Sequence, residues 1–472
     1  EAELPKMNSN NILEVSGLTV DFRTEDGSVR AVNGSSFALE KGKTIGIVGE
    51  SGSGKSVTSL SIMQLIPSPP GEISQGEIWF NSPTLGPTNL LELKGKTGKK
   101  DTMAKIRGNE ISMIFQEPMT SLNPVFTCGD QVIEAIQSHE KVSRAEAKSR
   151  TLELFREVEL PRPEQIMKSY PHQISGGQKQ RVMIAMAMAC NPALLIADEP
   201  TTALDVTVQK RILELMEELR VRHQMSIIFI THDLGVIAEI ADDVIVMYRG
   251  NIVETGSVKQ IFEDPQHPYT KGLIACRPPM DKRYSHLPTV TDFMATDDEG
   301  QIIEKASSVE AMLEEVEISS EAYRQRQSDL QAEQPIMRVE HLKTYFPIRS
   351  GFFGGISDHV KAVDDVSFDV YPGETLGLVG ESGCGKTTLG RTLLRLVEPT
   401  SGRITFDGVN ITALTQAELR KHRKDIQIIF QDPYGSLNPR MSIGNAILEP
   451  MKVHGILDND QQRKDRVREL LE

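Results

Sequence analysis

The sequence predicts an α/β protein built from two copies of one domain, the second of them incomplete. The first observation behind this prediction is the order of the elements. An apolar run at residues 43–49 (KTIGIVG) leads into a glycine-rich loop, and residues 57–66 continue as a helix. Two further apolar runs, residues 193–199 (ALLIADE) and 226–233 (SIIFITHD), have the length of buried strands and end in polar residues. Such strands are typical of a parallel sheet that presents its chemistry at their carboxyl ends.

The second observation is that the chain repeats itself. Residues 31–56 match residues 362–387 motif for motif, and residues 111–124 match residues 426–439. The separation of the paired motifs falls from 331 to 315 residues, so the first copy carries 16 extra residues. We expect them in a Gly- and Lys-rich surface loop at residues 93–101 (LKGKTGKKD). Two copies account for the 472 residues, which exceed what one hydrophobic core usually supports.

Acidic residues mark the segment between the copies, where the hydrophobic pattern weakens. We therefore expect a first domain at residues 1–284, an acidic linker or short solvated helix at residues 285–335, and the N-terminal part of a second domain at residues 336–472. Within the first domain, Ser143 and Glu146 have the spacing of a capping box. This spacing predicts that an amphipathic helix begins there.

The bulk composition excludes several classes of protein. The net charge of −14 disfavours a nucleic-acid partner, because such proteins usually carry a basic surplus. The four cysteines lie far apart without a CxxC pair, which predicts neither a disulfide framework nor a zinc site. No apolar run approaches the roughly 18 to 20 residues of a membrane span, and the N-terminus lacks a signal-peptide pattern. We expect the chain to be made and kept in the cytoplasm.

The repeated glycine-rich loop has the pattern of a phosphate-binding loop. In the first copy Gly49, Gly54, Lys55 and Ser56 stand at GxxxxGK[ST] spacing, between a predicted strand and a predicted helix. Backbone N–H groups can close around phosphates in such a loop, while the lysine adds charge and the serine supplies a magnesium ligand. A glycine-rich turn with a surface lysine is the alternative, and the repetition in context disfavours it. The residues predicted to bind nucleotide at the two loops are Gly49, Glu50, Ser51, Gly52, Ser53, Gly54, Lys55, Ser56, Val57, Gly380, Glu381, Ser382, Gly383, Cys384, Gly385, Lys386, Thr387 and Thr388.

Polar side chains at the ends of the other predicted strands complete a candidate site. Asp198 and Glu199 end one strand, where an uncompensated carboxylate pair would be costly without a cation or substrate nearby. Asp198 fits as a magnesium partner and Glu199 as the residue that polarises water. Gln116 and His232 end two further strands. A structural role is commoner for a lone histidine, but a position at a strand end beside Asp233 favours a functional one.

The stretch at residues 174–205 (ISGGQKQRVMIAMAMACNPALLIADEPTTALD) closely resembles the ABC-transporter ATPase family. Its ISGGQ is similar to the family signature LSGGQ, and the carboxylates and an ALD turn follow at the expected distance. A Ser-Gly-Gly sequence before a helix also suits an anion on physical grounds, although a capped helix start is the simpler interpretation. The resemblance implies the ABC ATPase form of the P-loop NTPase fold, with a RecA-like parallel-sheet core, an antiparallel β subdomain and a helical subdomain.

The resemblance also implies roles for individual residues. Glu199 would be the catalytic base, His232 the switch histidine and Gln116 the Q-loop glutamine. Phe22 and Phe346 would stack on the adenine of ATP. The signature residues, implied to contact the γ-phosphate held by the opposite domain, are Ser175, Gly176, Gly177 and Gln178, and the implied D-loop residue is Asp205. The implied ligands of Mg²⁺ are Ser56, Gln116, Asp198, Thr387 and Gln431.

In this family two ATPase domains close head to tail, which explains the repeat. A tether would supply the partner domain at an effective concentration of roughly millimolar. The second signature and the second pair of carboxylates are expected beyond Glu472, and the sequence reaches that residue inside a helical pattern without a stop signal. We therefore expect the second copy to be truncated. We also expect residues 1–472 to bind ATP but to hydrolyse it poorly as a monomer.

Three motifs narrow the resemblance to the peptide and nickel importer branch of the family. They are residues 115–124 (FQEPMTSLNP), 264–273 (DPQHPYTKGL) and 430–439 (FQDPYGSLNP). The tandem arrangement is most similar to the ATPases that drive glutathione or dipeptide import. Many single-domain relatives hold an iron–sulfur cluster on cysteines that follow HPYT. Only Cys276 is present here, so no cluster is expected.

The resemblance further implies partners and a location. Two membrane permease subunits and a solute-binding protein are expected, together with a dimer of ATPase domains within or between chains and a peripheral position on the inner face of the cell membrane. Residues near 117–170 and 432–472 would receive the permeases. The alternative is a soluble tandem ABC ATPase that acts on the ribosome, whose interdomain arm should be basic. Residues 297–333 hold eleven acidic and three basic residues, which favours transport. A nucleotide-binding regulator without hydrolysis is a third possibility.

Overall fold

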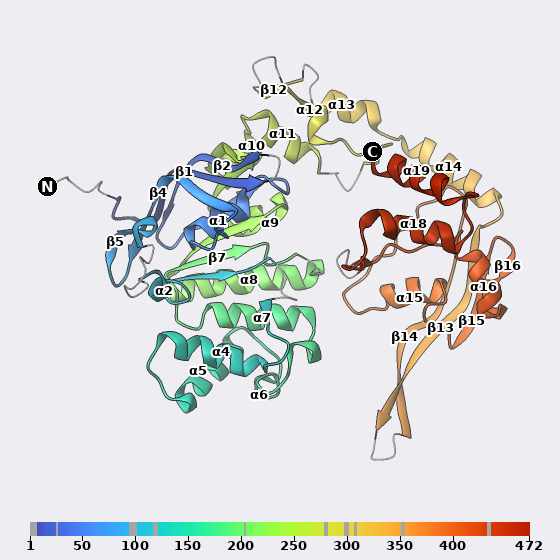
Figure 1. Ribbon diagram of the computed structural model, residues 1–472, viewed down its shortest axis with the longest axis horizontal. Coiled ribbons are helices and arrows are strands. Elements are labelled where there is room, and N and C mark those ends of the chain that lie inside the picture. Colours follow the sequence, from blue (N-terminus) through green and yellow to red (C-terminus); the bar gives the residue numbers. More distant parts are fainter. Residues whose placement is uncertain are drawn as a thin grey trace. The chain divides into compact units, whose positions relative to one another are not determined.

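The computed structural model of the protein divides into two compact units, Glu1–Ile318 and Ser319–Glu472 (Figure 1). Unit 1 and unit 2 are described separately below. The part of the chain that the structure describes comprises residues 7–24, 27–93, 102–116, 121–202, 204–277, 282–296, 302–305, 309–350, 355–431 and 436–472. The expected surface loop at residues 93–101 lies almost wholly outside these ranges.

The centre of unit 1 is a six-stranded sheet in the order β10-β9-β3-β8-β7-β6, in which all pairs but the β10–β9 pair are parallel. The apolar runs predicted as strands form β3, β7 and β8. Nearly all of their residues are buried, as expected for strands covered on both faces. The bounds are β3 Thr44–Val48, β6 Ile111–Ile114, β7 Leu194–Asp198, β8 Ser226–Thr231, β9 Asp243–Tyr248 and β10 Asn251–Ser257.

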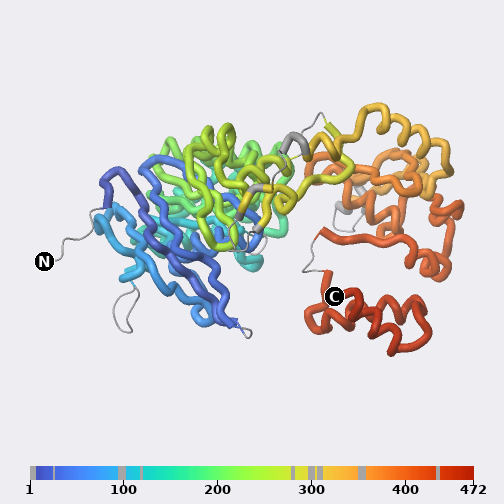
Figure 2. Tube along the Cα trace, turned by 90° about the horizontal axis from the view of Figure 1, so that it is seen from above, coloured from blue at the N-terminus to red at the C-terminus, as the bar shows by residue number. Residues whose placement is uncertain are grey.

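An antiparallel sheet in the order β2-β1-β4-β5 forms a second layer of unit 1. Figure 2 shows β1, β2 and β4 side by side at the outer edge of this unit. Alternate residues of the parallel strands, such as Ile47 and Ile196, share a hydrophobic core with this sheet and with α1. Their neighbours in sequence face the opposite core, because side chains alternate along a strand. The bounds are β1 Asn11–Thr24, β2 Gly27–Glu40, β4 Gly71–Ser82, β5 Gly86–Asn89 and α1 Lys55–Ile62.

Helices form the third layer of unit 1. In Figure 1, α7, α4 and α5 lie on the side of α8 that faces away from β7. The predicted capping position is confirmed, because the Ser143 side chain accepts a hydrogen bond from the Glu146 N–H at 3.2 Å where α5 begins. A buried core of Val, Ile, Leu and Met side chains joins this layer to the sheet. The bounds are α4 Cys128–His139, α5 Arg144–Glu157, α6 Pro163–Ile166, α7 Gly176–Ala187, α8 Val206–His223 and α9 Leu234–Ile240. The short helix α2 Met103–Ile106 instead contributes Met103 and Ile106 to the core shared with the antiparallel sheet.

The residues after β10 pack onto the same unit. Gly272 on α11 lies against Val290 of α12, where an added Cβ would come within 3.2 Å of the valine side chain, and Val290 and Phe293 are buried. Of the expected linker, residues 285–318 thus belong to the first compact unit, whereas α14 is a solvated helix without buried residues. The bounds are α10 Val258–Glu263, α11 Pro268–Ala275, α12 Val290–Phe293, β11 Met294–Thr296, β12 Ile302–Glu304, α13 Val309–Val316 and α14 Ser320–Ala332.

Unit 2 has an antiparallel sheet in the order β14-β13-β15-β16, with α15 packed on it through Leu389 and Thr392. Helices α18 and α19 share a small core of their own. The counterpart of β3, residues 374–380, forms no strand, and Val379 is 90% exposed. In unit 1, β3 is hydrogen-bonded to β8 on one side and to β9 on the other, whereas residues 374–380 pair with no strand in the described part of unit 2. The bounds are β13 Met337–Ser350, β14 Gly355–Val370, β15 Ser401–Phe406, β16 Val409–Asn410, α15 Lys386–Leu393, α16 Gln416–His422, α18 Ile443–Val453 and α19 Asp460–Leu471.

Among the described residues, no helix combines the length and the apolar character that crossing a bilayer would require.

Candidate functional site

The first phosphate loop joins β3 to α1 at the carboxyl edge of the parallel sheet. Its three glycines have positive φ angles, 153° at Gly49, 79° at Gly52 and 100° at Gly54. Two of them also lack room for a side chain. A Cβ would lie 2.1 Å from the Met247 carbonyl oxygen at Gly49 and 2.5 Å from the Ala31 carbonyl oxygen at Gly54. The loop can therefore be built only with glycine at these positions.

Lys55 is folded back into this loop. Its Nζ donates hydrogen bonds to the carbonyl oxygens of Gly49 at 2.7 Å and Glu50 at 2.8 Å, and the residue is only 5% exposed. Burial lowers the pKa of the Lys55 ammonium, and the nearby carboxylates of Glu199, Asp198 and Glu50 oppose this shift. A buried cation at the N-terminus of α1 suits an anionic ligand.

Ser56 and Asp198 bring two oxygen ligands together beside Lys55. The Ser56 hydroxyl donates to the Asp198 carboxylate at 3.1 Å. Burial raises the pKa of Asp198 to about 6, although the Ser56 hydrogen bond and Lys55 act in the opposite direction. Hydroxyl and carboxylate oxygens are the ligands that Mg²⁺ prefers, so these residues fit a magnesium ion that also binds phosphate oxygens. No group of three His, Cys, Asp or Glu side chains in the described part of the chain could hold a metal by itself.

Glu199 and His232 meet across the neighbouring strands β7 and β8. The Glu199 Oε2 lies 3.3 Å from the His232 Nδ1 and accepts a hydrogen bond from the Thr202 hydroxyl at 2.9 Å. The Glu199 backbone has a φ of 47°, a left-handed conformation that is costly for a residue other than glycine. A hydrogen bond from the Glu199 N–H to the Ile230 carbonyl oxygen at 2.9 Å holds it there. In this conformation the Glu199 carboxylate lies beside His232.

Gln116 is exposed beyond the end of β6, at the same edge of the sheet. Its side chain makes no hydrogen bond with the described residues. Phe22 lies near the end of β1, opposite Gly71 of β4, and is half-buried against the core. The structure thus brings together Lys55, Ser56, Asp198, Glu199 and His232. The contacts expected of Gln116 and Phe22 are contacts with a bound ligand.

The signature residues form the start of α7. The Ser175 Oγ accepts from the Gln178 N–H at 3.3 Å, and the Gln178 side chain accepts from the Ser175 N–H at 3.0 Å. These two hydrogen bonds form a capping box, the helix-capping role that is the alternative to anion binding for the ISGGQ motif. An added Cβ at Gly176 would meet nothing within 4 Å, so packing within the described structure does not require glycine there. Asp205 likewise caps α8, accepting from the Val208 N–H at 2.9 Å.

The second phosphate loop repeats the first in backbone and in lysine contacts. Lys386 Nζ donates to the carbonyl oxygens of Gly380 at 2.6 Å and Glu381 at 2.7 Å. Thr387 and Gln431, the predicted metal ligands here, are exposed. Phe346 on β13 is also exposed. No carboxylate takes the place of Asp198 in the described part of this unit.

Two residues of the site were missed by the sequence predictions. Thr202, which donates a hydrogen bond to Glu199, follows the carboxylates in PTTALD, and a hydroxyl so close to a glutamate predicted to be catalytic was a usable signal. Tyr269 is uncharged and lies 219 residues along the chain from Glu50, whose backbone N–H donates a hydrogen bond to the tyrosine hydroxyl. No local pattern could have linked these two residues.

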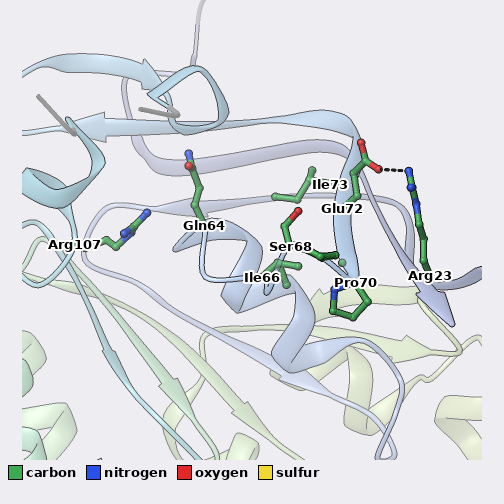
Figure 3. Close-up of a pocket in the computed structure, with 10 residues that line it drawn as sticks. Arg23, Gln64, Ile66, Ser68, Pro70, Glu72, Ile73 and Arg107 are labelled. Carbon is green, nitrogen blue, oxygen red and sulfur yellow. Dashed lines mark hydrogen bonds and ion pairs between the residues drawn. The ribbon is translucent and has the colours of Figure 1, made fainter. Parts of the chain in front are cut away.

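A pocket of about 630 Å³ lies beside the end of α1 and contains none of the predicted site residues (Figure 3). Figure 3 shows Gln64 and Arg107 on one side of it, with the ion pair of Arg23 and Glu72 on the other. A second pocket, of about 310 Å³, is lined by Glu50, Ser51, Gly52 and Ser53 of the first loop. The volume of a pocket therefore does not identify the chemical site in this protein.

Comparison with known proteins agrees with this geometry. The family model "ABC transporter" matches residues 32–202 and 363–472. The chain belongs to the ABC transporter family. It is accordingly an ATPase, and ATP and Mg²⁺ are the ligands on which such ATPases work, as predicted. A model for the "Oligopeptide/dipeptide transporter, C-terminal region" matches residues 253–299.

Relatives of known name cover the whole chain. The glutathione import ATP-binding protein GsiA of Salmonella choleraesuis (strain SC-B67) is 47% identical over 468 residues, which is 99% of this chain and 71% of that protein. GsiA of Escherichia coli (strain K12) is 45% identical over 456 residues, 96% of this chain and 69% of that protein. The dimeric structure of MJ0796, a bacterial ABC transporter cassette, is 27% identical and overlaps 52% of this chain and 98% of its own, with a TM-score of 0.46. The similarity to glutathione importers expected from the motifs is confirmed.

Proposed function

We propose that this chain is the ATP-binding and hydrolysing subunit that powers import of a small peptide-like solute through a membrane ABC transporter, with glutathione as the first candidate. One observation carries the proposal: residues 253–299 match the C-terminal region of oligopeptide and dipeptide transporters, in a chain 47% identical to a glutathione import ATP-binding protein. The comparisons give no support to the ribosomal alternative. Dipeptides and oligopeptides are the competing solutes.

We propose the following roles at the first loop. Lys55 and the loop amides would bind the phosphates, and Ser56, Asp198 and Gln116 would hold the magnesium ion, which screens phosphate charge when bound. Glu199 would orient and polarise the attacking water as general base, and its contacts with His232 and Thr202 support this role because they fix its carboxylate. Phe22 would stack on adenine, as Phe346 would at the second loop. The absence of an iron–sulfur cluster stays a prediction.

The second unit, in our proposal, is a second copy of the ATPase domain, incomplete within residues 1–472. Its loop residues Gly380–Thr388 repeat the first loop, and Gln431 occupies the position of Gln116. Ser175, Gly176, Gly177 and Gln178 would then contact the γ-phosphate of a nucleotide held by another domain, with Asp205 at the same interface. The exposed start of α7 supports this role, since a Cβ added at Gly176 would meet nothing within 4 Å and packing inside the described structure does not need a glycine there.

Two membrane permease subunits and a solute-binding protein are the proposed partners, at the inner face of the cell membrane, and no nucleic acid is proposed. Val125 and Phe126, 71% and 50% exposed, lie in the segment expected to receive a permease. Apolar side chains at such exposure suit a protein partner.

Reconstitution of the chain with its permeases in proteoliposomes tests the function. ATP-dependent uptake of labelled glutathione is expected, with weaker uptake of labelled dialanine, and the Glu199→Gln variant should bind ATP without supporting uptake. Uptake of dialanine alone would move the assignment to dipeptides. Recovery of the chain with ribosomes instead of membranes would contradict transport. Unchanged ATP turnover in Glu199→Gln would count against Glu199 as the base, and absence of ATP turnover in the wild-type protein would favour a regulator without hydrolysis.

A further inference from the structure

A tyrosine from the region after β10 contacts the back of the first phosphate loop. Tyr269 lies on α11, within the residues that match the oligopeptide/dipeptide transporter C-terminal region, and it is fully buried. Its hydroxyl accepts a hydrogen bond from the Glu50 backbone N–H at 3.0 Å. The contact joins the phosphate loop directly to a region that is not part of the nucleotide-binding motifs.

The peptide group between Gly49 and Glu50 is held from two opposite sides. Its carbonyl oxygen, on Gly49, accepts from Lys55 Nζ at 2.7 Å, whereas its N–H, on Glu50, donates to Tyr269. In a trans peptide these two groups point in opposite directions. Lys55 and Tyr269 therefore fix the rotation of one peptide plane, and that plane determines where the lysine ammonium lies in the loop.

Tyr269 is itself firmly placed. Its N–H donates to His267 Nδ1 at 3.1 Å, and the Glu254 carboxylate accepts from the N–H groups of Gln266 at 2.7 Å and His267 at 3.0 Å. The Tyr269 ring packs against Tyr248, with 4.4 Å between ring centroids. Burial raises the pKa of the Tyr269 hydroxyl, which keeps it neutral at physiological pH. A chain of contacts thus runs from β10 through the start of α11 to the phosphate loop.

We propose that Tyr269 is a positioning residue for ATP binding at the first loop, and that residues 253–299 set the geometry of this loop through it. The inference rests on the proposed function in that ATP is taken as the ligand. The second loop provides a contrast within the same chain. Glu381, the counterpart of Glu50, donates no such hydrogen bond among the described residues, although its lysine contacts are the same.

A comparison of Tyr269→Phe with Tyr248→Phe tests the proposal. Each substitution removes one hydroxyl and keeps the ring, and the Tyr248 hydroxyl makes no hydrogen bond with the described residues. Both are made in full-length Lys386→Ala protein, so that the second loop contributes little to binding. Tyr269→Phe should raise the Kd for MgATP about three- to tenfold, the range expected for one neutral hydrogen bond, with kcat at saturating ATP unchanged. Tyr248→Phe should leave Kd within about twofold.

Hydrogen exchange of the nucleotide-free protein separates positioning from general destabilisation. In Tyr269→Phe the Glu50 amide should exchange faster, while the amides of Ile47 and Ile230 in the neighbouring strands keep their protection. Unchanged exchange at Glu50, or an unchanged Kd for MgATP, would overturn the proposal. Equal loss of protection in the strands would overturn it as well, because the hydroxyl would then stabilise the whole unit. Failure of the Lys386→Ala parent itself to bind ATP would count against the proposed function instead.

Discussion

The two phosphate loops have the same backbone and different surroundings. The φ angles of Gly49 and Gly380 are 153° and 156°, and those of Gly54 and Gly385 are 100° and 101°. Both lysines donate to two loop carbonyls at 2.6 to 2.8 Å. Yet Val48 before the first loop is fully buried in β3, whereas its counterpart Val379 is 90% exposed and belongs to no strand.

This difference shows that the conformation of the loop depends on its own sequence, whereas the carboxylates beside it depend on the surrounding sheet. Three glycines and a lysine suffice to build the cradle, since it forms without a sheet around residues 374–380. Asp198 ends β7 and Glu199 follows it, while His232 follows β8. Among the described residues, the first loop alone has all three beside it, because it alone lies at the edge of a parallel sheet. Substitutions around the first loop and at matched positions of the second unit test this distinction, from the largest expected effect to the smallest.

Glu199→Gln should have the largest effect. Because Glu199 is the proposed general base, its removal is expected to slow hydrolysis about 10²- to 10⁴-fold in a single-turnover assay at high protein concentration, with ATP binding retained. The variant keeps the side-chain shape and so keeps the contact with Thr202.

Glu239→Gln is the matched control, since Glu239 is an exposed residue of α9 away from the carboxyl edge. It should hydrolyse ATP at the wild-type rate. Equal rates in Glu199→Gln and wild type would show that the carboxylate beside the first loop is not the base.

Ile47→Ala and Leu378→Ala compare the two strand positions that precede the loops. Ile47 is fully buried, so its truncation should lower the free energy of unfolding by about 2 to 5 kcal/mol. Leu378, its counterpart, is 54% exposed and should lose less than about 1 kcal/mol. Urea denaturation measures both. Equal losses would mean that residues 374–380 are as well packed in solution as β3.

Asp198→Asn should stabilise the nucleotide-free protein at high pH and leave its stability almost unchanged at low pH. The folded state raises the pKa of Asp198 from 3.8 to about 6, so it binds the proton more tightly than the unfolded chain. Stability therefore falls as pH rises from about 4 to 6, and the loss is complete above that range. Asparagine cannot ionise, so the substitution should raise the free energy of unfolding by up to about 3 kcal/mol at pH 8 and by almost nothing at pH 4. Thermal denaturation at the two pH values checks the sign, and a variant less stable than wild type at pH 8 would contradict it.

The sequence predicted which residues would lie together beside the first loop, because the motifs that carry them are local. GESGSGKS fixed the loop, and the apolar runs before Asp198 and His232 placed both at one edge of the sheet. What could not be predicted depends on long-range packing. The left-handed backbone of Glu199 and the Tyr269 contact arise between segments far apart in the chain. For residues 374–380 the same pattern that forms β3 forms no strand, because strand formation depends on neighbours as much as on composition.

Calorimetric titration with MgATP tests the central claim most directly, that ATP binds where Lys55 meets the carboxylates of the sheet. Lys55→Ala should weaken the tightest binding event about 10- to 100-fold, because a charged hydrogen-bond donor to phosphate is lost. Lys386→Ala, the matched substitution in the second loop, should leave that event within about twofold. Unchanged affinity in Lys55→Ala, with the loss appearing in Lys386→Ala instead, would contradict the account.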